Sequence, residues 1–170
     1  MGSVLVIGGG AAGLAAAIAA AECGDTVTVA EKMDRVGKKI LATGNGRCNL
    51  MNTGAPRYPG NAAFAADVLS RCGAEAQKAF WEHLGLRLRQ EEAGRVYPVS
   101  SQASSVLDAL RLQLTALHVR VVTGVSITAL QRENDGWTAL SADGQQFRAN
   151  RVIISGGGCA QPKLGSDGSA

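Results

Sequence analysis

Aromatic side chains are scarce in this chain of 170 residues, at 4% of the composition, and charged side chains make up only 18%. The four cysteines lie far apart and form no CxxC pair, and there are only two histidines. These absences argue against a large aromatic core, a redox-active dithiol and a thiolate zinc site, so we expect no metal site. Hydrophobic residues nevertheless reach 46%, which is typical of a globular protein.

Basic clusters and long apolar runs are also missing. The net charge is only +3, and the densest basic stretch, 32–47, is interleaved with glycine, which suits a small anionic ligand better than nucleic acid. The uncharged stretch 3–21 lacks a basic flank and is broken by three glycines, Gly8 to Gly10. It therefore fits neither a membrane span nor a signal peptide. We expect a cytoplasmic protein without membrane or nucleic-acid partners.

Glycine, in contrast, is abundant, with 22 residues, and it separates regular apolar segments. A buried strand at 3–7, a helix at 14–22 and a strand at 26–30 form a βαβ unit. The further expected elements are a short helix near 37–42, two helices within 61–84, strand-like alternation at 86–90, a helix at 101–117, buried strands at 119–122 and 151–155, and alternating strands at 125–131, 136–142 and 145–148. This order predicts an α/β, Rossmann-like domain with a central parallel sheet and a three-stranded antiparallel meander.

A glycine motif, Gly8-x-Gly10-x-x-Gly13, joins the first strand to the first helix. Its glycines allow a tight turn, close backbone approach to a pyrophosphate and close packing of helix on strand. Glu31 ends the second strand, 18 residues after Gly13, where a carboxylate accepts hydrogen bonds from an adenosine ribose and repels a 2′-phosphate. The motif therefore predicts a dinucleotide without a 2′-phosphate, and both FAD and NAD qualify.

The stretch GKKILATGNGRCN, residues 37–49, separates these two cofactors. Its glycines let the backbone approach a flat ligand closely, and Lys38, Lys39 and Arg47 offer cations to phosphates or to an electron-rich ring. A plain NAD-binding domain gives no reason for such a loop. The loop therefore favours FAD.

The motif GGGAAG, the stretch GKKILATGNGRCNLMN and the segment GRVYPVSSQASSVLDAL closely resemble the BaiN/YhiN-type family of bacterial NAD(P)/FAD-dependent oxidoreductases. The resemblance runs along essentially the whole chain. It implies a fold of the glutathione-reductase and fumarate-reductase flavoprotein type, with FAD as the cofactor. It also implies NAD(P)H or another small electron donor as a partner.

The resemblance further implies which residues hold the cofactor. The glycine motif would bind the pyrophosphate, Glu31 the ribose, the backbone of Val125 the adenine, and Lys39 with the loop 43–49 the ribityl chain and flavin. The full predicted set is Gly8, Gly10, Ala11, Ala12, Gly13, Glu31, Lys32, Lys39, Thr43, Gly44, Asn45, Gly46, Arg47, Cys48, Asn49, Val125, Gly156 and Gly157. The family's later ATGG and GSTGDG patterns are altered here, to Ser155–Gly158 and Gly165–Gly168.

The family's members are about twice as long, so residues 1–170 are expected to be a truncated FAD-binding domain. A helical excursion at 55–100 would lie within it, and a substrate domain would follow residue 170. An exposed sheet edge near that point favours homo-oligomers. The predicted function is the FAD-binding portion of an oxidoreductase that transfers hydride through flavin N5. An NAD-binding dehydrogenase domain and a non-catalytic fragment with an empty site are the alternatives.

Two residues of the loop allow two interpretations each. Cys48 beside Arg47 is either a reactive thiolate or, as we favour, a small residue packed beneath the flavin loop. Arg47 either anchors a phosphate or braces the loop, and its guanidinium does not act as an acid. No catalytic acid or base is predicted within the chain.

Overall fold

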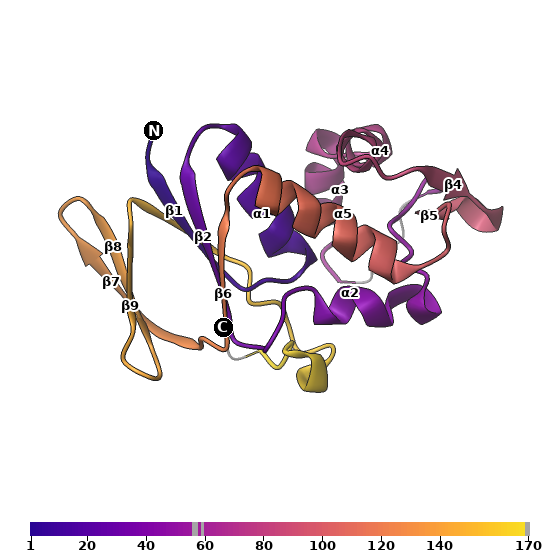
Figure 1. Ribbon diagram of the computed structural model, residues 1–170. Coiled ribbons are helices and arrows are strands. Elements are labelled where there is room, and N and C mark those ends of the chain that lie inside the picture. Colours follow the sequence, from indigo (N-terminus) through magenta and orange to yellow (C-terminus); the bar gives the residue numbers. More distant parts are fainter. Residues whose placement is uncertain (56–57, 59, 169–170) are drawn as a thin grey trace. The chain divides into compact units, whose positions relative to one another are not determined.

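A computed structural model describes residues 1–55, 58 and 60–168 (Figure 1). Residues 56, 57 and 59 of the expected 55–100 excursion lie outside this description. The chain forms two compact units, the first from Met1–Ile40 with Leu110–Ala170 and the second from Leu41–Ala109. Each unit has its own sheets and is described by itself.

The first unit contains a four-stranded parallel sheet with the strand order β10-β1-β2-β6. Its strands are β1 (Ser3–Ile7), β2 (Thr26–Glu31), β6 (Arg120–Thr123) and β10 (Arg151–Ile154). The alanine-rich helix α1 (Ala11–Glu22) connects β1 to β2 and is followed by Gly24 in the left-handed conformation. The predicted βαβ unit and central parallel sheet are therefore confirmed.

An antiparallel meander of β7 (Ile127–Glu133), β8 (Gly136–Ser141) and β9 (Gln146–Ala149) follows β6 in the same unit (Figure 1). Its buried residues Ala139 and Phe147 form one hydrophobic cluster with Leu5 and Ala30 of the parallel sheet. Burial of this shared apolar surface holds the meander on the sheet. The predicted three-stranded meander is thus confirmed.

The second unit contains the helices α3 (Ala62–Arg71) and α4 (Ala74–His83), as the pattern at 61–84 predicts. Its small antiparallel sheet has the order β3-β5-β4. The remaining elements are α2 (Lys38–Ala42), η1 (Thr43–Gly46), β3 (Met51–Asn52), β4 (Leu88–Gln90), η2 (Glu92–Gly94), β5 (Arg95–Pro98), α5 (Ala103–Ala116) and, in the first unit, η3 (Pro162–Leu164). Helices α2 and α5 each carry the chain from one unit into the other. Among the described helices, none is both long and apolar enough to cross a membrane.

Two details differ from the sequence-based expectations. Helix α1 begins at Ala11 rather than at residue 14, so the glycine turn is shorter than expected. The strands β6 and β10 are not buried, since Val121 is 38% exposed and Ile154 is 64% exposed. Both are outer strands of the sheet in the described chain, with one hydrogen-bonded neighbour strand each. An apolar run of residues therefore did not mean that the strand is buried on both faces.

Candidate cofactor-binding site

A cleft of about 520 Å³ lies at the carboxyl ends of the parallel strands of the first unit. From β1, the sheet continues to β2 and β6 on one side and to β10 on the other. Ligands of open α/β sheets bind at such a reversal of strand order, outside the carboxyl ends of the strands. The volume falls within the range of pockets that hold small ligands.

The glycines of the motif serve three different purposes. Gly8 has a φ of +104°, and a Cβ there would lie 2.6 Å from the carbonyl oxygen of Ser155. A Cβ on Gly13 would lie 1.9 Å from the carbonyl oxygen of Gly8, so Gly13 packs the helix directly against the turn. A Cβ on Gly10 would meet no atom within 4 Å, so its space opens to the cleft.

The N-terminus of α1 lies at this cleft, which Gly10, Ala11 and Ala12 line. Gly10 is the N-cap and provides no side-chain hydrogen bond, and the first turn carries no acidic residue. The first backbone N–H groups of a helix have no partner within the helix, and its dipole is positive at this end. The arrangement fits a phosphate group.

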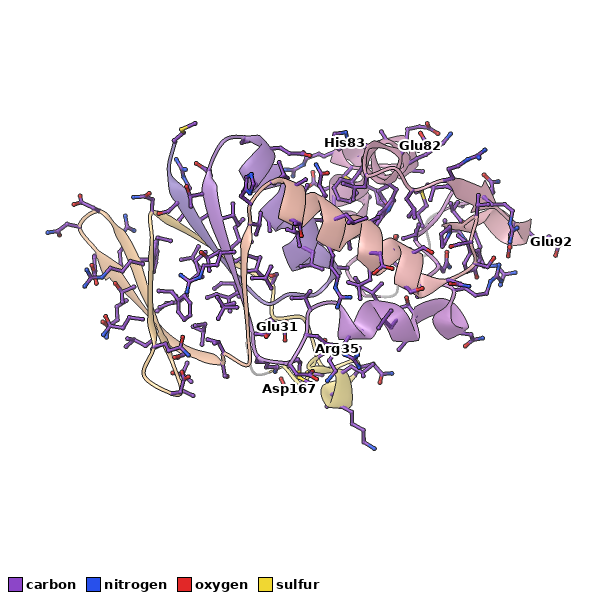
Figure 2. The ribbon with its side chains drawn as sticks, viewed as in Figure 1. Glu31, Arg35, Glu82, His83, Glu92 and Asp167 are labelled. Carbon is purple, nitrogen blue, oxygen red and sulfur yellow. The ribbon has the colours of Figure 1, made fainter. Side chains whose placement is uncertain are left out.

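Glu31 joins the end of β2 to the glycine turn (Figure 2). One carboxylate oxygen accepts a hydrogen bond from the backbone N–H of Gly9 at 2.6 Å, and the other accepts from that of Met33 at 2.7 Å. The side chain is only 8% exposed, yet it lines the cleft. Because each carboxylate oxygen has a second lone pair, Glu31 fits a ribose while holding the turn.

Gly9 is a functional residue that sequence reasoning missed, because the motif treats its position as variable. A Cβ on Gly9 would lie 2.5 Å from Val36 and 3.1 Å from the Glu31 carboxylate. Its N–H and carbonyl are both engaged, the latter by the backbone N–H of Gly37 at 2.8 Å. The run of three glycines was the signal that could have identified it.

Val125 is buried and lines the cleft at the entry to the meander. Its backbone N–H donates to the carbonyl oxygen of Glu31 at 2.9 Å. The predicted backbone contact to adenine would therefore be made by the Val125 carbonyl. Ile127, Ala129 and Leu130 of β7 add an apolar wall, which sequence reasoning did not assign to the site.

The cleft also gathers cationic side chains. Lys32 pairs with Asp167 at 2.6 Å, and Lys38 pairs with Asp34 at 2.8 Å. Lys39 donates to the hydroxyl oxygen of Ser166 at 2.7 Å. Of the predicted set, the structure brings together Gly8, Gly10, Ala11, Ala12, Glu31, Lys32, Lys39, Val125, Gly156 and Gly157. Lys38, which the sequence offered as a cation for a phosphate, also lines the cleft, and the lining residues that were not predicted include Met33, Arg35, Leu164, Gly165 and Ser166.

Ser155 fastens the glycine turn to β10, in place of the alanine expected in the family pattern. Its hydroxyl lies 2.9 Å from the carbonyl oxygens of both Ile7 and Gly8. Its backbone N–H donates to the Ile7 carbonyl at 2.8 Å. The altered pattern at 155–158 thus still forms a turn beside the cleft, and Gly157 adopts a φ of +83° in it.

The loop Thr43–Asn49 belongs to the second unit, and its place along a flavin stays a prediction. Gly44, Asn45, Gly46 and Cys48 all have left-handed backbone conformations, with φ from 54° to 81°. Such conformations cost free energy in non-glycine residues such as Asn45 and Cys48. The loop is therefore held in a strained shape by contacts elsewhere.

Arg47 supplies part of that support. Its guanidinium lies over the Tyr97 ring, 4.1 Å from the ring centre, and forms an ion pair with Glu91. Arg89 pairs with the same carboxylate at 2.9 Å. Of the two interpretations of Arg47, these contacts favour the one in which it braces the loop.

Cys48 is enclosed in this loop, at 7% exposure. Burial raises the pKa of its thiol, and only a hydrogen bond with Thr43 acts in the opposite direction. Because the thiolate is the nucleophilic form, this shift reduces reactivity. The geometry favours a packing role for Cys48.

The ion pairs of Glu91 predict a pH dependence of stability. Its hydrogen bond with Arg47, and then that with Arg89, lower the pKa of Glu91 below its ordinary 4.5. A lowered pKa stabilises the fold above the ordinary value, and the stabilisation is lost as the pH falls through the lowered one. We expect urea midpoints of the wild type to fall more between pH 6 and pH 3 than those of Glu91→Gln. Glu92→Gln, an exposed neighbour, is the control, and equal declines in all three proteins would contradict the prediction.

The parallel sheet, the glycine turn after β1 and the Glu31 carboxylate at the end of β2 define a Rossmann-type dinucleotide-binding domain. The HI0933-like protein Rossmann domain family matches residues 2–170, so the chain belongs to that family. These proteins are FAD-dependent oxidoreductases of the BaiN/YhiN type. The predicted family, fold class and cofactor are thus confirmed.

Two curated relatives align along most of the chain. A 3-dehydro-bile acid delta(4,6)-reductase from Clostridium scindens is 46% identical over 174 residues, which cover 99% of this chain and 42% of that protein. A ribosomal RNA dihydrouridine synthase from Haemophilus influenzae is 26% identical over 168 residues, covering 95% of this chain and 42% of that protein. The chain thus spans about two fifths of the length of these relatives.

A solved structure, 3-ketosteroid-delta4-(5alpha)-dehydrogenase from Rhodococcus jostii RHA1 in complex with 4-androstene-3,17-dione, has the same fold. The TM-score is 0.66 at 18% identity, and the match covers 92% of this chain and 46% of that one. At this identity the likeness concerns the fold alone.

Proposed function

We propose that this chain is the FAD-binding portion of a flavin-dependent oxidoreductase that transfers hydride through flavin N5 to or from a small substrate. When bound, FAD supplies the hydride chemistry, and the protein binds and orients it. The observation that carries the proposal is a single cleft that joins the glycine turn, the uncapped N-terminus of α1 and the Glu31 carboxylate.

The residues of the cleft would have separate tasks. The N–H groups at the start of α1 would hold the pyrophosphate beside Gly10, where no side chain intervenes. The Glu31 carboxylate would accept hydrogen bonds from the hydroxyls of the adenosine ribose, and the Val125 carbonyl would contact the adenine. The loop Thr43–Asn49, braced by Arg47, would lie along the ribityl chain and flavin.

The names of the two relatives suggest a reaction class. A delta(4,6)-reductase of a 3-oxo steroid and a dihydrouridine synthase each act on a carbon–carbon double bond conjugated to a carbonyl. Reduction adds a hydride to the carbon distant from the carbonyl and a proton to the nearer one. We propose this class for the parent enzyme, with NAD(P)H as the electron donor. The higher identity to the bile acid reductase, 46% against 26%, favours a small enone over ribosomal RNA.

The first test is cofactor retention. The purified chain is incubated with FAD, desalted, and its absorbance spectrum recorded, and a parallel sample is titrated with NAD by calorimetry. Flavin retained at close to one per chain supports the proposal. Binding of NAD with no flavin retained would replace it with an NAD-binding domain, and binding of neither would leave a scaffold without a cofactor.

A further inference from the structure

Ser166 and Lys39 meet at one corner of the cleft, although they are far apart in the sequence. The Lys39 ammonium donates to the Ser166 hydroxyl oxygen at 2.7 Å, across a separation of 127 residues. Ser166 is 4% exposed and lines the cleft, and Lys39 is half-buried beside it. A buried serine hydroxyl thus fixes the position of a cation within the cleft.

Lys39 differs from the other two lysines of the cleft in the partner of its ammonium, which is a hydroxyl and not a carboxylate. Lys32 and Lys38 each pair with a carboxylate, Asp167 and Asp34 respectively. The ion pairs described within residues 1–55, 58 and 60–168 include none of Lys39. A half-buried ammonium that donates to a neutral hydroxyl is suited to bind an anion.

The donors at this corner outnumber the acceptors. An ammonium has three N–H donors, of which Ser166 takes one. The other two N–H groups of Lys39 can therefore donate to a ligand. Two donors on one ammonium suit a group that carries several oxygen atoms, as a phosphate does.

The corner also lies next to the glycine turn. A Cβ on Gly157 would lie 2.6 Å from the Ser166 hydroxyl oxygen and 3.9 Å from the Lys39 ammonium. A Cβ on Gly8 would lie 3.1 Å from the Cα of Gly156, the residue before Gly157. A phosphate at the start of α1 would thus be near this corner.

We propose that Lys39 binds the pyrophosphate of the dinucleotide, rather than the ribityl chain as the family resemblance implies, and that Ser166 is its positioning residue. This inference rests on the proposed FAD binding. A glycine is needed at 157 because a side chain there would displace Ser166. The segment 161–168, which neither the glycine motif nor the loop 37–49 indicates, thereby completes the phosphate site.

The test measures dissociation constants for FAD and for ADP, which share the pyrophosphate, in the wild type and in variants. Lys39→Gln and Ser166→Ala are each expected to weaken both ligands about tenfold, the usual effect of losing a hydrogen bond to a charged group. Ser166→Thr should restore affinity, since it keeps the hydroxyl. Lys163→Gln, an exposed lysine of the same segment outside the cleft, is the charge-matched control and should bind as the wild type does.

Two readouts separate this role from a merely structural one. If Ser166 acts through Lys39, the double variant should bind no more weakly than Lys39→Gln alone, whereas independent effects would multiply. The salt dependence of FAD affinity should also flatten in Lys39→Gln, as a charge on a phosphate is lost. Wild-type affinity in both single variants, or multiplicative effects with unchanged salt dependence, would overturn the inference. Failure of the wild type to bind FAD or ADP would instead overturn the proposed function.

Discussion

Gly13→Ala is expected to lower the free energy of unfolding by about 3 kcal/mol, and the Tm by about 10 °C, and to abolish FAD retention. The added Cβ would lie 1.9 Å from the Gly8 carbonyl oxygen and 2.5 Å from the Ser155 hydroxyl. Neither atom can move without a cost in free energy, because the first is a backbone carbonyl oxygen and the Ser155 hydroxyl is hydrogen-bonded to the turn. The helix must therefore move away from β1, taking its N–H groups away from the phosphate position.

Urea unfolding followed by circular dichroism, together with flavin absorbance after desalting, checks this prediction. Gly10→Ala is the matched variant, because its Cβ would meet no atom within 4 Å and its φ is an ordinary −78°. It should keep the wild-type stability yet bind FAD more weakly, since the methyl group enters the phosphate space. Wild-type stability in Gly13→Ala would mean that the helix does not need this close contact.

The contrast between Gly10 and Gly13 illustrates how far the sequence predicts the site. The order of strand, glycine turn, helix, strand and carboxylate depends on local spacing, so β1, α1, β2 and Glu31 were predictable. The motif could also assign a general purpose to each glycine. The clash distances that make Gly13 a packing position and Gly10 an open one follow only from the folded backbone.

Contacts between distant residues were not predictable. The bond between Lys39 and Ser166 spans 127 residues, and that between Lys32 and Asp167 spans 135. No periodicity links such pairs, because their meeting depends on how the whole parallel sheet is ordered. The same holds for Arg47 and Glu91, whose ion pair favours one of the two interpretations of Arg47 that the sequence left open.

The sequence pattern also failed to predict a very short strand and the exposure of an outer strand. Strand β3 has only two residues and exists because Met51 and Asn52 pair with Val96 and Arg95. A two-residue strand carries no alternation that a pattern could reveal. Likewise, the apolar run at 151–155 predicted a buried strand, but the exposure of β10 depends on which elements flank the sheet.

Glu31→Gln is expected to lower the free energy of unfolding by about 2 kcal/mol and to weaken FAD binding about tenfold or more. The carboxylate accepts from Gly9 and Met33 through its two oxygens, and an amide has only one oxygen to offer. Its NH₂ group would then face a backbone N–H within a largely buried position. The glycine turn would lose one of its attachments to β2, and a bound ribose would lose an acceptor.

Ligand selectivity gives this prediction a readout that stability alone does not move. The wild type should prefer ADP to adenosine 2′,5′-bisphosphate, because the Glu31 charge repels a 2′-phosphate. In Glu31→Gln this preference should shrink, whereas Glu31→Asp should retain it, and calorimetry with both ligands measures the ratio. An unchanged ratio of the two affinities in Glu31→Gln would mean that Glu31 does not contact the ribose and only supports the glycine turn. A reduced ratio would show that one carboxylate both holds the glycine turn and selects the cofactor.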